Sequence, residues 1–99
     1  MMREDFWTYV AANRHHSTLY TGMTNNLERR MWEHKHPADS KSFSARYCIT
    51  ELMWCEYFPT ALDAIACEKR IKGLSRAKEV VMITAQNPRW IDLSAEWYG

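Results

Sequence analysis

The sequence predicts a small α/β fold, in which a three-stranded, mainly antiparallel sheet is flanked by helices in the order β-β-α-β-α-α. Two stretches near the start alternate aromatic and β-branched residues, a third run of strand formers follows at 47–58, and helix-spaced apolar residues with capping signals lie between and after them. The chain has 99 residues, of which 46% are hydrophobic and 25% charged, with a net charge of +1. This profile is typical of one globular domain, so we expect residues 1–99 to form a single domain.

The first two strands are predicted as a hairpin. Residues 6–12 alternate in character, "NRHHS" supplies a polar turn, and residues 18–23 resume the alternation. Side chains two apart share a face of a strand, so Tyr20 lies on the same face as Gly22. Tyr9 of the first arm stands near Tyr20 if the strand register allows it.

A helix is expected directly after the hairpin, with Thr24 as its N-cap and its end before Pro37. A polar stripe at a spacing of four runs beside its apolar face: Asn26, Arg30 and His34. The segment "HPADSKSFSAR" is small and polar and is predicted as a loop before the third strand.

The second predicted helix begins at Thr60 and ends at Gly73, which is expected as the C′ residue. Its apolar stripe contains Ala64 and Ile71, and Glu68 falls on the same stripe. A carboxylate among apolar residues needs a partner, because a buried unpaired charge is costly.

The third predicted helix begins at Ser75 and should bury Val80, Val81 and Ile83. Asn87 precedes a proline, which pushes it out of helical geometry.

Three cysteines, Cys48, Cys55 and Cys67, form no CxxC pair and lie in apolar segments, which predicts buried, reduced thiols. No His/Cys pair has the spacing of a zinc finger or ribbon, so no zinc site is expected. The sequence has no apolar run of signal-peptide or membrane-span length, and we expect a cytoplasmic protein without membrane contact.

Two charged residues allow a structural and a chemical interpretation each. Glu68 is either ion-paired with a basic neighbour or a ligand of Mg²⁺ or Mn²⁺, which prefer oxygen ligands. Arg30 either packs its stem on Trp32 or Tyr47, or forms a bidentate fork for a phosphate.

Three uncharged groups are similarly ambiguous. Tyr9 and Tyr20 are packing residues by default, but a tyrosine hydroxyl near an arginine could orient or deprotonate a water. His34 is either an exposed histidine at a helix C-terminus or a base.

Taken together, five segments resemble the GIY-YIG nuclease family over nearly the whole chain, and most closely its small stand-alone branch. The segments are "TYV", "LYTG", "MTNNLERRMWEH", "EKRIKGLSRAKE" and "QNPRWIDL". The residues that match the family's functional positions are Tyr9, Tyr20, Arg30, His34, Glu68 and Asn87. Trp7, Thr8 and Thr21 depart from the two name-giving motifs, at packing positions rather than at chemical groups.

The resemblance implies hydrolysis of phosphodiester bonds in nucleic acid with one divalent metal, Mg²⁺ or Mn²⁺, and no small-molecule cofactor. Glu68 would hold the metal and Arg30 would bind the scissile phosphate. Tyr20, supported by Tyr9 or His34, would activate or position the attacking water.

Around such a site, Lys35, Lys72 and Arg76 are candidates for contacts with flanking phosphates. DNA is the expected substrate, attacked by structure or without specificity, because no second domain is expected to read bases. Three further features are compatible with the sequence: RNA as substrate, a link to DNA repair or recombination, and a protein partner for targeting.

Two other functions remain as alternatives. A nucleic-acid-binding module or accessory subunit would use the same basic face without cutting. A protein-interaction domain would use exposed aromatic residues such as Trp32, Trp90 and Trp97.

Overall fold

The computed structural model describes residues 5–98 and confirms the predicted architecture. In chain order the elements are β1 (Phe6–Ala12), β2 (Leu19–Thr24), α1 (Leu27–Lys35), α2 (Phe43–Tyr47), β3 (Glu51–Phe58), α3 (Ala61–Lys72) and α4 (Arg76–Gln86). The short helix α2 was not predicted. It begins after Ser42, whose side chain accepts a hydrogen bond from the backbone N–H of Ala45.

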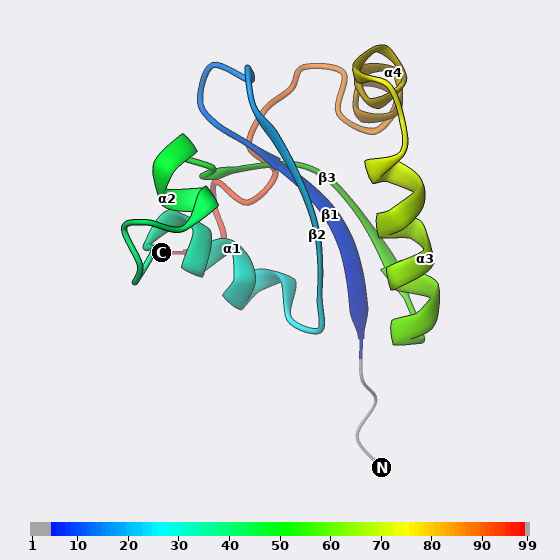
Figure 1. Ribbon diagram of the computed structural model, residues 1–99, viewed down its shortest axis with the longest axis horizontal. Coiled ribbons are helices and arrows are strands. Elements are labelled where there is room, and N and C mark those ends of the chain that lie inside the picture. Colours follow the sequence, from blue (N-terminus) through cyan, green and yellow to red (C-terminus); the bar gives the residue numbers. More distant parts are fainter. Residues whose placement is uncertain (1–4, 99) are drawn as a thin grey trace.

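The sheet has the order β2-β1-β3, and both pairs of neighbours are antiparallel. In the register of the hairpin, Tyr9 lies opposite Gly22 and Ala11 lies opposite Tyr20. Figure 1 shows α1 and α2 on one side of the sheet and α3 and α4 on the other. In this order β2 is an edge strand and β1 is the central one.

Alternating residues of the strands belong to two separate clusters of buried side chains, one on each side of the sheet. On the side of α3 and α4 these are Val10, Ala12, Met53, Trp54, Cys67, Ile71 and Ile83. On the side of α1 they are Tyr9, Ala11, Leu27, Met31, Ile49 and Leu52. The alternation follows from the two-residue period of a strand.

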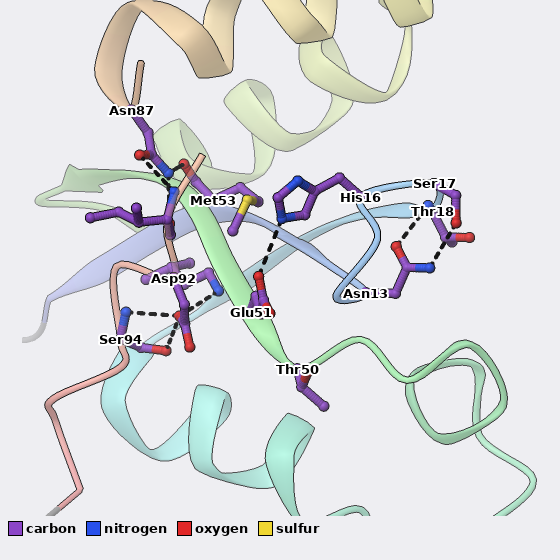
Figure 2. A network of polar contacts seen from close by, with 12 residues as sticks. Asn13, His16, Ser17, Thr18, Thr50, Glu51, Met53, Asn87, Asp92 and Ser94 are labelled. Atoms are coloured by element: carbon purple, nitrogen blue, oxygen red, sulfur yellow. Dashed lines mark hydrogen bonds and ion pairs between the residues drawn. The ribbon is translucent and has the colours of Figure 1, made fainter. Parts of the chain in front are cut away.

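The segment after α4 is fastened to β3 by side-chain hydrogen bonds (Figure 2). The Asn87 amide donates to the carbonyl oxygen of Met53 over 3.1 Å. The Asp92 carboxylate accepts from the backbone N–H of Leu52 over 2.9 Å, and its other oxygen accepts from Lys35 Nζ over 2.8 Å. These bonds tie the end of the chain to the third strand and to α1.

Several local expectations are wrong. Asn26, not Thr24, caps α1, because the Asn26 side chain accepts from the N–H of Arg29 while the Thr24 hydroxyl accepts from Asn26 N–H. Gly73 is the C-cap itself, with an ordinary φ of −85°. The third strand begins at Glu51, since residues 43–47 are helical.

Burial also differs from expectation at two valines and two cysteines. Val80 and Val81 are 36% and 70% exposed, and of the predicted trio only Ile83 is buried. At about 100° per residue, Val81 lies about 200° from the buried Ile83 and faces away from the sheet, whereas Val80 lies about 60° from Ile83, at the border of the buried face. Cys48 is exposed and Cys55 half-buried, which leaves Cys67 as the buried thiol among the three. None of the helices within residues 5–98 is long and apolar enough to cross a membrane.

Candidate active site

The site is organised by a close approach between the two strands of the hairpin. The Tyr9 ring reaches from the central strand across Gly22 of the edge strand. A Cβ atom at Gly22 would lie only 2.6 Å from the Tyr9 hydroxyl oxygen and 2.7 Å from Cζ. Glycine is thus required at this position because of close packing, and it lets the Tyr9 hydroxyl project toward α1.

Helix α1 supplies a guanidinium to this hydroxyl. Arg30 Nε donates to the Tyr9 oxygen over 3.1 Å, and Arg30 Nη1 lies 3.4 Å from Glu33 Oε1. The Arg30 side chain keeps 37% of its surface exposed. Nε and Nη1 of the guanidinium are therefore held by protein groups, and its exposed part can bind a ligand from solvent.

His34 lies one turn further along α1 and is enclosed, with only 2% exposure. Its Nε2 is 2.8 Å from the Tyr9 hydroxyl and its Nδ1 is 2.5 Å from Ser44 Oγ. Burial, together with the nearby positive charge of Arg30, lowers the pKa of His34 to about 4. The imidazole is neutral at pH 7, contrary to the alternative of an exposed histidine.

Ser44 is the residue of this network that the sequence did not reveal. It belongs to α2, in a segment predicted as a loop, and a serine among polar residues carries no distinguishing signal. Ser44 and His34 lie on different helices, so no sequence spacing indicates that their side chains are hydrogen-bonded.

Burial raises the pKa of Tyr9 to about 12, although the hydrogen bond from Arg30 acts in the opposite direction. Tyr9 is fully buried and stays protonated at pH 7. Its oxygen accepts from Arg30, and its proton can be donated to Nε2 of the neutral His34, which then donates from Nδ1 to Ser44. This tautomer is assigned from the hydrogen-bond network.

Tyr20 is the more accessible of the two tyrosines. It is half-buried, and its ring centroid lies 5.3 Å from that of His34 and 6.2 Å from that of Tyr9. Hydrogen bonding to Tyr9 and Tyr20 outweighs burial and raises the pKa of Arg30. Tyr9 and Tyr20 therefore lie close together, as the sequence predicted on condition of a suitable strand register.

Glu68 lies on α3, which packs against β1 and β2. Its negative charge is the smallest of the causes that act on the raised pKa of Tyr9, so the carboxylate is within electrostatic reach of the Tyr9 hydroxyl. Glu68 is 21% exposed, and Oε2 lies 3.1 Å from Lys72 Nζ, so the expected ion pair exists.

The carboxylate of Glu68 also fits a divalent metal by its chemistry. Within residues 5–98 no group of three or more His, Cys, Asp or Glu side chains could hold a metal ion. Mg²⁺ needs no such cage, because it is commonly held by one or two carboxylates, waters and substrate phosphates. Glu68, which keeps 21% of its side chain exposed, could supply such a carboxylate.

The structure does not bring three other predicted residues into the network. Asn87 is 3% exposed, and its amide is bonded to backbone groups of Met53 and Ile91. Lys35 pairs with Asp92, and Arg76 donates to the carbonyl oxygen of residue 16 in the hairpin turn over 2.7 Å. Lys72, which is 57% exposed, remains beside Glu68.

A hollow of about 360 Å³ opens beside the network. Arg30, Glu33 and His34 form one wall, and residues of the 36–44 segment form the other. A larger hollow, of about 630 Å³ and lined by Trp7 and Trp97 among others, contains none of the candidate site residues. We assign the site to the smaller one, because it adjoins the arginine and the histidine.

Comparison with known proteins agrees with this geometry. The model of the GIY-YIG catalytic domain matches residues 5–80. A UPF0213 protein of Natronomonas pharaonis is 40% identical over 78 residues, which cover 79% of this chain and 89% of that protein. A UPF0213 protein of Oceanobacillus iheyensis is 34% identical over 85 residues, covering 86% and 96% of the two chains.

A solved structure supports the fold. The solution NMR structure of a UPF0213 protein from Bacillus halodurans superposes with a TM-score of 0.55 at 20% identity, and covers 93% of this chain and 97% of that one. The GIY-YIG domain is a nuclease domain that binds DNA and generally uses a divalent metal. On the match of the family model and the identity with its relatives, this chain belongs to the GIY-YIG family, among the small UPF0213 proteins.

Proposed function

We propose that this protein is a divalent-metal-dependent endonuclease that hydrolyses phosphodiester bonds in DNA. The observation that carries the proposal is the buried Tyr9–His34 pair whose tyrosine accepts a hydrogen bond from Arg30, with the half-buried Tyr20 beside it and Glu68 within electrostatic reach. The hollow beside the network is lined by Arg30 and His34. A positioned cation with a hydroxyl and a carboxylate nearby is suited to phosphoryl chemistry, which depends on positioning and on stabilising negative charge.

Arg30 binds the scissile phosphate. The Tyr9 oxygen and the Glu33 carboxylate each accept a hydrogen bond from the guanidinium, and the exposed part of the guanidinium can donate to phosphate oxygens. Because the guanidinium is positioned before the substrate arrives, little reorganisation is required as charge develops on the phosphate.

Tyr20 contacts the attacking water. Tyr9 is fully buried and protonated, so it serves as a positioning residue, and both ring nitrogens of His34 are engaged by Tyr9 and Ser44. Tyr20 is half-buried, whereas Tyr9 and His34 are buried, so of the two tyrosines it is the one assigned to orient the nucleophile. His34 acts through Tyr9 by fixing its hydroxyl.

Glu68 holds the metal, Mg²⁺ or Mn²⁺. When bound, such an ion supplies positive charge for the leaving oxygen. Glu68 must exchange its ion pair with Lys72 for this role. The exchange is inexpensive because Lys72 is mostly exposed, and exposed ion pairs contribute little to stability.

The proposal includes structure-directed or non-specific action on DNA, in repair or recombination. The proposal also includes RNA as a further substrate and a protein partner that targets the nuclease. Lys72 is the flanking phosphate contact that we keep, because it is exposed and lies next to the site.

The test is nicking of supercoiled plasmid with Mg²⁺ and with Mn²⁺. Arg30→Ala and Glu68→Gln should each lower nicking by a factor on the order of 100 or more. Arg29→Ala, the exposed neighbour on α1, and Glu96→Gln, an exposed carboxylate near the C-terminus, are the matched controls and should nick like wild type. Absence of nicking, or nicking that survives both site substitutions, rejects the proposal.

One observation favours the alternative of a binding module without cleavage. The Glu68 carboxylate is occupied by Lys72, an arrangement that needs no metal. In that case the wild type would bind DNA in EDTA with a salt-dependent affinity, and Glu68→Gln would leave this affinity intact. Nicking would be absent with either Mg²⁺ or Mn²⁺.

A further inference from the structure

Helix α2 has an unusual composition for its position. None of its five residues is buried, yet it carries Phe43 and Tyr47, which are 46% and 44% exposed. Large aromatic side chains stabilise a fold mainly through the area they bury, and these two bury only about half of theirs. Their presence on this helix is therefore poorly explained by packing alone.

The two rings are ordered relative to each other and to the site. The centroids of Phe43 and Tyr47 lie 4.6 Å apart with an interplanar angle of 38°. Phe43 is also 5.7 Å from the Tyr20 ring, at an angle of 37°. An aromatic surface thus begins at the proposed water-binding tyrosine and continues outward along α2.

The surface is held in place and is positively charged. Ser44 fastens α2 to His34 through its bond to Nδ1, and the backbone N–H of the fully buried Ile49 donates to the Ser44 carbonyl over 2.9 Å. The guanidinium carbon of Arg46 lies 5.9 Å from the centroid of the Tyr47 ring. A cation beside exposed rings attracts a ligand that has both phosphate charge and a flat apolar face.

We propose that Phe43 and Tyr47 form a stacking surface for an unpaired nucleobase next to the scissile phosphate. This inference rests on the proposed function and names its substrate class: DNA that has unpaired nucleotides at the cleavage point, such as a single strand, a gap or a flap. The bases of intact duplex are already stacked on each other, so exposed protein rings gain contacts only with bases that are unpaired.

The test compares binding of two DNA molecules in EDTA, which separates binding from cleavage. Both have the same sequence, and one contains a short unpaired stretch with a fluorescent purine analogue whose emission falls on stacking. We expect the unpaired DNA to bind at least about 5-fold more tightly than the duplex, from the stacking of one base. Its emission should fall on binding.

The variant Phe43→Leu/Tyr47→Leu keeps apolar bulk and removes both planar rings. It should lose the preference and the change in emission. Trp97→Ala, an aromatic residue of comparable exposure at 37%, is the matched control and should retain both. Circular dichroism of each variant verifies that the fold is intact.

The outcomes distinguish this inference from the proposed nuclease. Equal binding of both DNA molecules, or a preference that survives in the double variant, overturns the stacking surface even if plasmid is nicked. Tighter binding of the matching single-stranded RNA overturns the assignment to DNA. A ring-dependent preference supports the surface, and absence of nicking in the same preparation then counts against the nuclease alone.

Discussion

The two sides of the sheet are made from the same strands but are built differently. On the side of α3 and α4, the buried cluster contains aliphatic residues such as Val10, Ile71 and Ile83, with Trp54 and Cys67. On the side of α1, the fully buried Tyr9 places its hydroxyl within hydrogen-bond distance of Arg30 and His34. One side stabilises the fold, and the other encloses polar groups that face a hollow.

The difference shows how a chain of 99 residues can combine an apolar core on one side of its sheet with a buried cluster of polar groups on the other. Burying His34 costs free energy because its charged form is excluded, and the network compensates by bonding both ring nitrogens. The apolar side has no such cost. Substitutions on the apolar side should therefore affect unfolding, and those on the polar side should affect chemistry and pH dependence.

The largest expected effect is that of Ile71→Ala on the apolar side. Ile71 is fully buried, and removing its side chain leaves a cavity, so the free energy of unfolding should fall by about 2–5 kcal/mol. Leu62→Ala, on the same helix but 79% exposed, is the matched control and should change it by less than about 0.5 kcal/mol. Urea unfolding measures both, and a small loss for Ile71→Ala would mean that this side is not the main core.

The next effect is a pH dependence of stability that originates on the polar side. The pKa of His34 is about 4 in the folded protein, against 6.5 for the free side chain. Between these values the unfolded chain binds the extra proton, so stability should be lost as the pH falls from 6.5 toward 4, by at most about 3 kcal/mol.

Urea unfolding at several pH values measures this loss. His34→Gln should flatten the dependence in that window, whereas His15→Gln, an exposed histidine of the hairpin turn, should retain it. The same slope in wild type and in His34→Gln would show that another group is responsible.

A third prediction concerns Gly22, where the polar side is most tightly packed. In Gly22→Ala the new methyl group meets the Tyr9 hydroxyl, so the ring must move and its bonds to Arg30 and His34 must lengthen. We expect a loss of about 1–3 kcal/mol in stability and at least a tenfold loss of nicking.

The matched control is Gly73→Ala, where a Cβ would have its nearest neighbour at an ordinary 3.5 Å and φ is −85°. It should be neutral or slightly stabilising, because alanine restricts the unfolded chain. Thermal unfolding and the plasmid assay are the measurements. Unchanged activity in Gly22→Ala would exclude the Tyr9 network from catalysis.

The smallest effect is expected for Lys35→Met. Because Lys35 bonds to Asp92 and to the Thr50 carbonyl, its loss should lower stability by about 1 kcal/mol and leave the affinity for DNA and its salt dependence unchanged. Lys72→Met should instead weaken binding to DNA and reduce the salt dependence. If Lys35→Met instead reduced the salt dependence of DNA binding, this would support the contact between Lys35 and a DNA phosphate that the sequence predicts.

Much of the fold was predictable because it depends on local signals. The alternation around Tyr9 and Tyr20 predicted the hairpin, and the Thr60 cap and the apolar spacing predicted α3. Helix α2 was missed because its five residues are too few to show a period, and a helix so short is not stable without tertiary contacts. Val81 was misjudged because its apolar character was read without its direction around the helix.

The sequence by itself determined the types of chemical group: two tyrosines, an arginine, a histidine and a carboxylate, in segments that match one nuclease family. Only the tertiary structure decided their states. The enclosure of His34 makes it neutral, the approach over Gly22 points Tyr9 at Arg30, and the position of Ser44 fixes the imidazole. The reason is physical, since protonation and hydrogen bonding depend on neighbours from other strands and helices, and no local pattern encodes those neighbours.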